Sequence, residues 1–368
     1  MSPTAVAFDT GPLHGARTGI GFAVQALCAA LGERDDVSLQ PYVLSFRAAL
    51  EPGTTRLPLP ASVAQRLWAH TSHPRVDRWV RGAQLVHGTN YVVPPTALPT
   101  VVSVYDCWFL THPDQANPHV RRAGAVLRAA IARGAVVHTS SHATEVTVRS
   151  LFPGAPVRTI HLGPLPLPMP SADPPIPELS GRPYVVAIGT LERRKNLPTL
   201  VRAFGALAHR HPDLALVLAG GDGDDVGAVA AAIDQLGDGL SHRVLRTGRI
   251  DEGARSWLLR HAAALAYPSL DEGFGFPLLD AMQAETPVVA STAGSIPEVA
   301  GDAALLCDPL DHGALAAHLH TLLTDAAERD RVVELGRDRW PEFEWQRCAD
   351  EMVHLYGRVM RGDTDDLR

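Results

Sequence analysis

Residues 271–282, Asp-Glu-Gly-Phe-Gly-Phe-Pro-Leu-Leu-Asp-Ala-Met, combine a glycine turn with the start of a helix. Apolar side chains recur after the turn at helical spacing, at Phe276, Leu279 and Met282. Pro277 suits the first helical turn, where its missing N–H costs nothing. The backbone N–H groups of the turn belong to Gly273, Phe274 and Gly275. We therefore expect these donors at a helix N-terminus, where an anion such as a diphosphate is favoured.

Two carboxylates flank this expected anion site. Glu272 enters from the strand side, and Asp280 lies about one turn into the helix, from where it can reach back toward the same ligand. Ionised carboxylates accept hydrogen bonds from hydroxyl groups. An anion site between two of them suits a ligand with phosphate at its centre and sugars at its ends, which describes a nucleotide sugar.

The composition is that of an ordinary globular protein. The chain has 368 residues, longer than one core usually supports, so two domains are expected. Its formal net charge of -7 argues against a nucleic-acid partner. Four scattered cysteines without metal-ligand spacing indicate a reducing compartment. The N-terminal residues lack a signal-peptide pattern and no run of eighteen apolar residues occurs, so we expect a cytoplasmic protein.

Strands and helices are expected to alternate in two stretches, which a proline-rich segment separates. Residues 163–183 hold eight prolines, so this segment cannot be a helix or a central strand and is typical of a stiff linker. Expected strands are 4–8, 85–87, 100–105, 135–139, 157–161, 184–189, 214–219, 244–247, 264–267 and 287–290. Expected helices are 21–31, 120–133, 143–151, 197–211, 226–236, 254–261 and the one containing Pro277.

Continuous apolar strands between helices indicate parallel sheets that are covered on both faces. The sequence therefore predicts an α/β protein with two doubly wound, Rossmann-like domains, over 1–165 and 184–345, and a linker over 166–183. Ligand loops follow the carboxyl ends of the strands in such sheets, so the two sets of loops would face each other across a cleft.

Two further loops could bind phosphate. Residues 14–21 contain three glycines before the first helix, and Gly19 would let the backbone approach a phosphate or a sugar oxygen; a plain tight turn is the alternative. Residues 189–196 follow the first strand of the second domain. There Arg194 offers a fork of donors and Lys195 a point charge for a diphosphate, with Arg193 expected to be exposed. The alternative is a solvated basic turn with Glu192 as partner.

The acidic stretch 220–225 resembles a metal site but is better explained as a turn. It follows an apolar strand and precedes a helix, so its glycines would form the turn and its aspartates would cap the helix. We therefore expect no metal ion.

The first domain offers weaker candidates at its strand ends. Asp106 could orient a sugar hydroxyl or a neighbouring side chain, or it could cap a loop, and His87 and Asn90 end another strand. The sequence contains no GxSxG motif, Walker loop or Cys/His nucleophile pattern. The basic helix 120–133 is typical of a wet surface face; contact with an anionic membrane or a lipid-linked acceptor is the alternative.

These motifs, in this order, resemble the retaining glycosyltransferases of family four, which have the two-Rossmann GT-B fold. The resemblance rests on the acid-x7-acid segment Glu272–Asp280, on residues 189–196 and on residues 292–299, Thr-Ala-Gly-Ser-Ile-Pro-Glu-Val. Residues 17–21 are similar to the family's N-terminal glycine loop. Residues 343–345 and a last helix within 346–368 are similar to its ending, in which that helix returns to the first domain.

The resemblance implies a role for each candidate residue. Donor-phosphate contacts would come from Arg194, Lys195, Gly19, Gly273, Phe274 and Gly275. Glu272 would bind the hydroxyls of the donor sugar, and Asp280 would bind the ribose. The resemblance also implies a metal-independent transfer of a hexosyl unit from a nucleotide-diphosphate sugar to a hydroxyl acceptor, with retained configuration. The leaving phosphate would itself take the acceptor proton, so positioning and charge stabilisation would carry the catalysis.

The chain departs from the family pattern at two positions. Asp280 stands where the family has glutamate, which is one methylene longer. Tyr105 stands before Asp106, where many members have a histidine near the reaction centre; a tyrosine can donate one hydrogen bond but cannot act as an imidazole near neutral pH. We place Tyr105 and Asp106 with Glu272 among the catalytic candidates.

The acceptor is left open between a lipid-linked glycan, a polysaccharide end and a small molecule. Two other functions compete with the transferase. An epimerase-like enzyme would use the same glycine-rich anion site, although Arg194-Lys195 with the Glu272–Asp280 spacing favours transfer. A non-catalytic nucleotide-sugar-binding subunit has only Tyr105 in its support.

Overall fold

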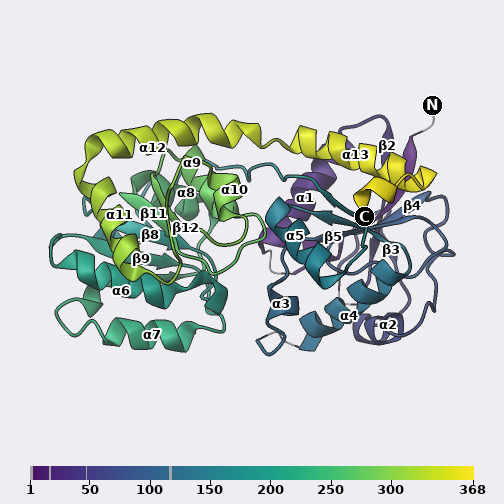
Figure 1. Cartoon of the computed structure of the whole chain (residues 1–368), viewed down its shortest axis with the longest axis horizontal. Coiled ribbons are helices and arrows are strands. Elements are labelled where there is room, and N and C mark those ends of the chain that lie inside the picture. The colour runs from purple at the N-terminus through teal and green to yellow at the C-terminus, as the bar shows by residue number, and fades with distance from the viewer. Residues whose placement is uncertain (1–2, 16–17, 47, 116–117) are drawn as a thin grey trace. The chain divides into compact units, whose positions relative to one another are not determined.

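The structure is a computed structural model that describes residues 3–15, 18–46, 48–115 and 118–368. Contacts divide the chain into two compact units. Unit 1 comprises residues 1–163 and 343–368, and unit 2 comprises residues 164–342. Both units are coloured along the chain in Figure 1. The predicted boundaries at 165 and 345 remain predictions, and each unit is described separately below.

Unit 1 is built on a seven-stranded parallel sheet. Its strands lie in the order β3 (Thr55–Arg56), β2 (Val37–Val43), β1 (Thr4–Asp9), β4 (Leu85–Gly88), β5 (Thr100–Val104), β6 (Val136–Thr139) and β7 (Val157–Thr159). Every neighbouring pair is parallel, with Phe8 beside Pro41 of β2 and His87 of β4. The central strands are buried on both faces, as in a doubly covered sheet. The sequence pattern missed β2 and β3.

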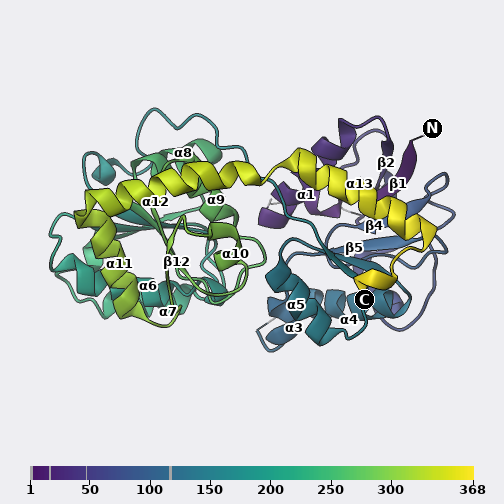
Figure 2. The same cartoon turned by 45° about the horizontal axis from the view of Figure 1, so that its top comes forward.

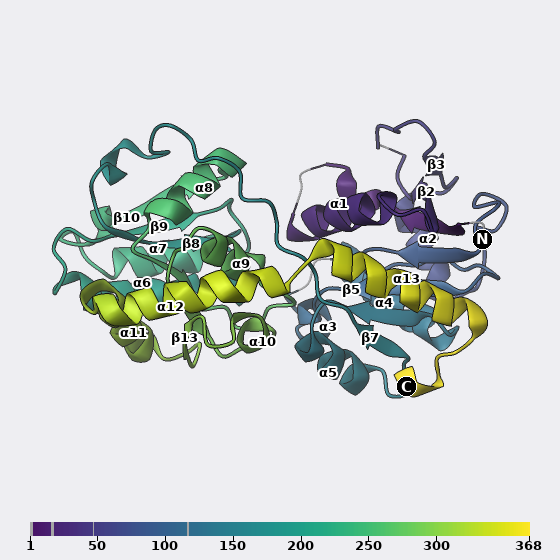
Figure 3. The ribbon, with the colours of Figure 1, turned by 90° about the horizontal axis from the view of Figure 1, so that it is seen from above.

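Helices cover both faces of the unit 1 sheet. The main apolar core joins one face to helices α2 (Ala61–Trp68), α4 (Pro118–Ala132) and α5 (His142–Leu151), with the short α3 (Trp108–Thr111) against α4. The other face carries α1 (Gly19–Gly32) and the C-terminal helix α13 (Trp345–Arg361), which run side by side in Figures 1 and 3. The predicted return of the last helix to the first domain is therefore confirmed.

The sequence of α13 explains why it packs there. Its buried residues recur at helical spacing and form one apolar stripe. They are Cys348, Ala349, Met352, Leu355, Tyr356 and Val359. Gly163 allows the start of this helix to approach closely, because a Cβ atom on it would lie 2.5 Å from the Trp345 ring.

A buried chain of hydrogen bonds also fastens α13 to the sheet. His138 Nε2 donates to the Ile160 carbonyl (3.2 Å), so its Nδ1 must accept from Ser103 Oγ (2.9 Å). Ser103 in turn accepts from His87 Nε2 (2.8 Å), and His87 Nδ1 accepts from the Tyr356 hydroxyl (2.7 Å). Burial lowers the pKa of both histidines, that of His138 to about 4, so both stay neutral. The sequence candidate His87 is thus a satisfied core residue.

Unit 2 is built on a six-stranded parallel sheet. Its strands lie in the order β10 (Val244–Gly248), β9 (Ala215–Ala219), β8 (Tyr184–Ile188), β11 (Ala264–Tyr267), β12 (Val288–Ser291) and β13 (Leu305–Cys307). One face packs against α6 (Leu197–Ala208), α7 (Val226–Asp234) and α11 (His312–Thr324). The second group of helices is α8 (Glu252–His261), α9 (Phe276–Gln283), α10 (Ile296–Ala300) and α12 (Ala326–Arg339). Figure 2 shows α8 and α9 on the opposite side of this sheet from α6 and α7.

The proline-rich segment is bound to unit 2 along α8 and α9. Ser256 Oγ donates to the Pro168 carbonyl (2.7 Å), and Arg255 Nη2 donates to that of Pro166 (3.0 Å). Gln283 on α9 donates to the Leu165 carbonyl (3.0 Å). Prolines cannot donate backbone hydrogen bonds, so these three contacts use carbonyl oxygens of the segment. Ser171, which is not a proline, donates its N–H to the Gly253 carbonyl (3.1 Å).

The two predicted parallel sheets are confirmed. Among the described residues, no helix is both long enough and apolar enough to cross a membrane.

Candidate active site

The carboxyl edge of the unit 2 sheet gathers three charged side chains into one cluster. Lys195 Nζ lies 2.5 Å from Glu272 Oε1, and Arg194 Nη1 lies 2.8 Å from Glu272 Oε2. Glu272 is only 6% exposed, and Lys195 is also buried. The structure therefore brings together the three residues that the sequence singled out most strongly, from segments almost eighty residues apart.

The chain holds both cations by fixing the turn that carries them. Residues Arg193–Lys195 form a 3-10 turn after β8, and Asn196 follows in the left-handed conformation with φ 54°. The Asn196 amide donates to the Pro268 and Pro309 carbonyls, at 3.1 and 2.6 Å. Because asparagine tolerates this backbone conformation and bonds the neighbouring loop, it locks Lys195 in place. Arg193 is exposed, as expected.

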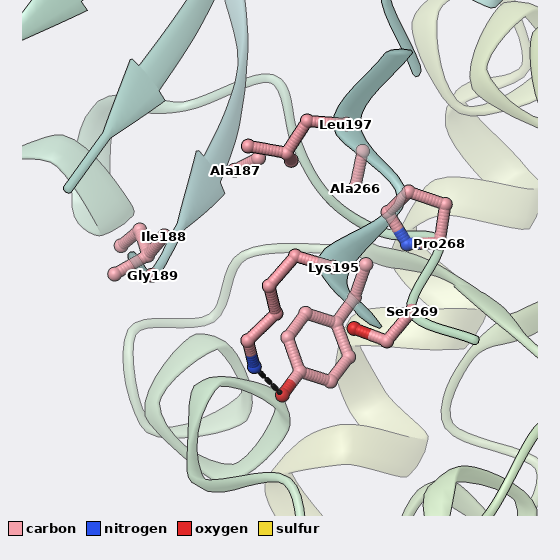
Figure 4. A pocket seen from close by; sticks show the side chains of 9 residues that line it. Ala187, Ile188, Gly189, Lys195, Leu197, Ala266, Pro268 and Ser269 are labelled. Atoms are coloured by element: carbon pink, nitrogen blue, oxygen red, sulfur yellow. Dashed lines mark hydrogen bonds between the residues drawn. The ribbon is translucent and has the colours of Figure 1, made fainter. Parts of the chain in front are cut away.

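Tyr267, at the end of β11, is a further member of the cluster that the sequence pattern did not identify. Lys195 Nζ donates to the Tyr267 hydroxyl (3.0 Å) and lies 4.9 Å from the centre of its ring. Figure 4 shows this bond beside a small pocket that Gly189, Leu197 and Ser269 help to line. Tyr267 is 3% exposed, and burial raises the pKa of its hydroxyl well above the ordinary value. The Tyr267 hydroxyl therefore stays protonated, and its oxygen accepts a hydrogen bond that positions the Lys195 ammonium group.

Electrostatics keep Glu272 ionised in spite of its burial. Burial alone would raise the pKa of this carboxyl, but Lys195 and Arg194 outweigh that effect and hold the pKa at about 2. Burial and the neighbouring Arg194 lower the pKa of Lys195, while Glu272 opposes that shift. A buried charge in such a cluster is stable only while its partners remain, so the three side chains act as one unit.

The glycine turn after Glu272 has the geometry expected from the sequence. Gly275 is the N-cap residue of α9 with φ 97°, a conformation that favours glycine, and Pro277 lies in the first helical turn. Gly273, Phe274 and Gly275 are all buried at this helix start.

A second loop supports the Glu272 backbone. Ser295 N donates to the Glu272 carbonyl (3.0 Å). Gly294 has φ 55°, and a Cβ atom there would lie 2.6 Å from the Glu272 backbone N and O atoms. A glycine is thus required at position 294, because its backbone lies so close to the loop that carries Glu272.

Asp280 belongs to a separate ion pair. It is 3% exposed, and its Oδ2 accepts a hydrogen bond from Arg255 Nη1 of α8. Arg255 also donates to Glu252 (2.6 Å) and to the proline-rich segment. Burial raises the pKa of Asp280 to about 6, although Arg255 opposes the shift. Its Oδ1 is buried and has no hydrogen-bond partner among the described residues. Arg255 is a second residue that the sequence pattern did not single out, because only tertiary packing joins it to Asp280.

The acidic turn 220–225 is confirmed as a glycine turn but not as a helix cap. Asp225 occupies the N-cap position of α7, yet its side chain accepts no capping hydrogen bond. Asp222 pairs with Arg246 (2.5 Å), and Asp224 Oδ1 accepts from the Arg193 N–H (3.0 Å). The capping prediction is therefore wrong, because Asp222 instead pairs with a side chain of β10 and Asp224 binds the turn after β8. A Cβ atom on Gly220 would lie 1.9 Å from the Gly189 carbonyl oxygen, so close packing explains that glycine.

The candidates of unit 1 lie at the carboxyl edge of its sheet. Tyr105 follows β5, is 6% exposed and packs its ring edge-on against His138. Asp106 Oδ2 accepts from the Tyr91 hydroxyl (3.1 Å), and its Oδ1 accepts from the Trp108 N–H (3.2 Å). Asp106 thus caps its loop through the Trp108 N–H and orients a neighbouring side chain through the Tyr91 hydroxyl.

The N-terminal glycine loop is described only in part. Gly19 is the first residue of α1, after the N-cap residue Thr18, and is exposed. Ala16 and Arg17, which belong to the predicted loop, lie outside the described residues.

Comparison with known proteins defines the class in two steps. Solved structures share the fold of the whole chain: sucrose-phosphate synthase from Thermosynechococcus elongatus aligns with a TM-score of 0.73 at 21% identity, over 98% of this chain and 100% of that one. Anabaena Alr3699/HepE in complex with UDP-glucose aligns with a TM-score of 0.71 at 18% identity, over 96% and 99%. The fold is therefore GT-B, the two-domain glycosyltransferase architecture.

A family model matches within unit 2. Residues 171–339, slightly under half of the chain, match the model described as Glycosyl transferases group 1. This match supports the resemblance to the family-four glycosyltransferases over that region.

Curated relatives match about half of the chain. O-antigen chain mannosyltransferase B of Escherichia coli is 33% identical over 184 residues, which are 49% of this chain and 47% of that protein. MMP alpha-(1->4)-mannosyltransferase of Mycolicibacterium hassiacum is 37% identical over 126 residues, 33% of this chain and 31% of that protein. The chain thus aligns with less than half the length of these two relatives.

Proposed function

We propose that this protein is a retaining, metal-independent glycosyltransferase that moves a hexosyl unit from a nucleotide-diphosphate sugar to a hydroxyl acceptor. The observation that carries the proposal is the buried Arg194–Glu272–Lys195 cluster beside the N-terminus of α9. The matching family region, the mannosyltransferase relatives and a protein of the same fold solved with UDP-glucose support it.

We expect the donor to replace contacts within the cluster: its diphosphate would take the place of Glu272 as the partner of the two cations. A diphosphate carries more negative charge than one carboxylate, so it would draw Lys195 and Arg194 toward itself. Glu272 would then have free lone pairs for the hydroxyls of the donor sugar. The N–H groups near Phe274 and Gly275, at the helix start, would complete the phosphate site.

Departure of the nucleotide diphosphate builds negative charge on the leaving phosphate, and the two cations are already positioned to stabilise it. As the new bond forms on the same face of the sugar, the acceptor hydroxyl proton would pass to that phosphate oxygen. No protein nucleophile is needed in this scheme. Tyr105 and Asp106 of unit 1 are proposed to be catalytic residues. Asp280 is proposed to bind the ribose, with the ribose replacing Arg255 as its partner.

The cellular location belongs to the same proposal. We propose a cytoplasmic protein, in which the basic face of α4 is a solvated surface; peripheral contact with an anionic membrane is the alternative for this face. Arg121 and Arg128 are exposed on that helix. The Arg128 guanidinium lies over the Phe152 ring at 4.9 Å, so part of its charge is engaged by an aromatic face.

The decisive experiment is product analysis with UDP-glucose and GDP-mannose as donors and a panel of glycoside acceptors, with EDTA present throughout. A new glycoside with the anomeric configuration of the donor supports the proposal. An isomerised nucleotide sugar would indicate the epimerase-like enzyme. Donor binding with neither hydrolysis nor transfer would indicate the non-catalytic subunit, and an inverted product would contradict retention.

A further inference from the structure

One side chain of unit 2 joins Asp280 to the proline-rich segment. Arg255 on α8 donates through Nη1 to Asp280 Oδ2 on α9. Its other terminal nitrogen, Nη2, donates to the Pro166 carbonyl oxygen (3.0 Å) and to Glu252 Oε2 (2.6 Å). The segment is therefore held by the same guanidinium group that occupies Asp280, the residue proposed to bind the ribose.

Arg255 has two acidic partners that differ in exposure. The Asp280 side chain is 5% exposed, whereas the Glu252 side chain is 51% exposed. Burial disfavours the charge on Arg255, but Asp280 and then Glu252 outweigh burial and raise the pKa of the guanidinium group above its ordinary value. Solvent screens an exposed ion pair. A guanidinium group that loses Asp280 keeps only a counter-ion at the surface, so we expect it to move outward with Glu252.

The ion pair between Arg255 and Asp280 is incomplete. A guanidinium group and a carboxylate can form two parallel hydrogen bonds. Here Asp280 Oδ1 and Arg255 Nε are both buried, and neither atom has a hydrogen-bond partner among the described residues. Buried polar groups are rarely left unpaired. A ligand hydroxyl that donates to Asp280 would satisfy an acceptor that Arg255 leaves open, which favours exchange of the partner.

Other contacts hold the segment without help from this arginine. The Leu165 and Pro168 carbonyl oxygens accept hydrogen bonds from two other side chains of unit 2. The Ser171 N–H donates to the Gly253 carbonyl (3.1 Å). Loss of the Pro166 contact alone should therefore loosen the segment without detaching it.

We propose that Arg255 couples the occupation of Asp280 to the hold on the proline-rich segment. A ligand hydroxyl that takes Asp280 releases the guanidinium group to Glu252, and the hydrogen bond to the Pro166 carbonyl is lost with it. The identification of that ligand as the ribose of a nucleotide rests on the function proposed above. Coupling between two sites is reciprocal, so the bound segment also weakens ribose binding, and Arg255 acts as an autoinhibitory contact.

The test compares nucleotides with and without ribose hydroxyls. The probes are UDP, GDP and their dideoxy counterparts, which lack both ribose hydroxyls, each at a concentration that calorimetry shows to saturate the full chain. Hydrogen exchange followed by mass spectrometry reports on the backbone amides of residues 165–171. We expect the ribonucleotide that binds to speed this exchange about threefold or more, as loss of one hydrogen bond can, and its dideoxy counterpart to leave the exchange unchanged.

Three variants separate coupling from simple loosening of the segment. Arg255→Met should speed the exchange without nucleotide and should abolish the difference between the two kinds of nucleotide. Ser256→Ala removes the hydrogen bond to the Pro168 carbonyl, so it should speed the exchange but keep that difference. Arg337→Met is the matched control, because it removes an exposed arginine that pairs with Glu285 just after α9, and it should change neither quantity.

The comparison of nucleotides in the wild type does not depend on the folding of any variant. Equal exchange with the two saturating nucleotides, or a difference that persists in Arg255→Met, would overturn the coupling and leave the donor site intact. If neither UDP nor GDP binds, the nucleotide-sugar site fails, and the coupling fails with it.

Discussion

The two units carry the same kind of parallel sheet but opposite electrostatics at their carboxyl edges. At the unit 2 edge, Glu272 lies between two cations, and the pKa of this carboxyl falls to about 2. At the unit 1 edge, Asp9 has no cation partner among the described residues, and its pKa rises to about 7. Burial opposes ionisation in both, so the partners decide the difference. The carboxyl edge of unit 2 thus holds an ionised carboxylate between two cations, whereas the carboxyl edge of unit 1 holds a carboxyl group whose ionisation is disfavoured.

Removal of Glu272 should have the largest effect of the substitutions proposed here, because it takes the ionised carboxylate out of the unit 2 edge. Glu272→Ala should lower turnover by on the order of 10²-fold or more, since contacts made in the transition state are lost. It should also destabilise unit 2 by about 3–5 kcal/mol, because Lys195 is left buried without its counter-ion. Steady-state kinetics and thermal unfolding measure the two effects. Glu192→Ala, which removes a more exposed partner of Arg194, serves as the control; equal losses in both variants would contradict the assignment.

Removal of Lys195 should act mainly on the donor. Lys195→Ala should weaken the affinity for UDP-glucose or GDP-mannose by on the order of 10- to 100-fold, the value of a hydrogen bond to a charged group. Isothermal titration calorimetry measures it. The exposed neighbour Arg193 supplies the matched control, Arg193→Ala, whose donor affinity should stay within about twofold. Unchanged donor affinity in Lys195→Ala would show that donor binding does not depend on the Lys195 ammonium group.

Removal of the Tyr267 hydroxyl tests whether donor binding depends on the hydrogen bond between Lys195 and Tyr267. Tyr267→Phe keeps the ring and removes the hydroxyl that accepts from Lys195, so donor KM should rise about 3- to 10-fold with little change in the melting temperature. A comparable loss is not expected from Tyr184→Phe, which removes another buried hydroxyl of unit 2, bonded to the Leu258 carbonyl (2.8 Å). If the two variants lose donor affinity equally, the effect is structural.

The pH dependence of stability distinguishes Asp9 from Glu272. The folded-state pKa of Asp9 lies above its ordinary value of 3.8, so its contribution to stability is full below about pH 4 and is lost as the pH rises toward 7. Asp9→Asn should therefore be more stable than the wild type at pH 8, by on the order of 1 kcal/mol, and lose that advantage near pH 4. Chemical denaturation at both pH values measures this, and a loss of stability at pH 8 would contradict an uncompensated carboxyl.

The sequence predicted those parts of the site that carry a local signal. Pro277 and Gly275 mark a helix start by their own backbone preferences, and α9 begins there as predicted. The basic turn was recognised because Arg194 and Lys195 follow a strand end directly.

The parts that were missed depend on tertiary neighbours. Arg255 and Tyr267 look like ordinary residues until α8 and β11 pack beside their partners. Asp9 is a lone acid after a short strand, and only the adjacent strands reveal that it lacks a cation. The strand β2 escaped notice because it contains Pro41 and polar residues between its apolar ones, which weakens the strand pattern.

The most direct test of the central claim is a thermal-shift panel of nucleoside diphosphates and their sugars, first without metal and then with magnesium. A ligand that binds only the folded state raises its melting temperature. We expect one nucleotide family to raise it clearly, with no further change on addition of magnesium and with the shift lost in Lys195→Ala. No shift with any member of the panel would show that the Arg194–Glu272–Lys195 cluster is not a nucleotide-sugar site.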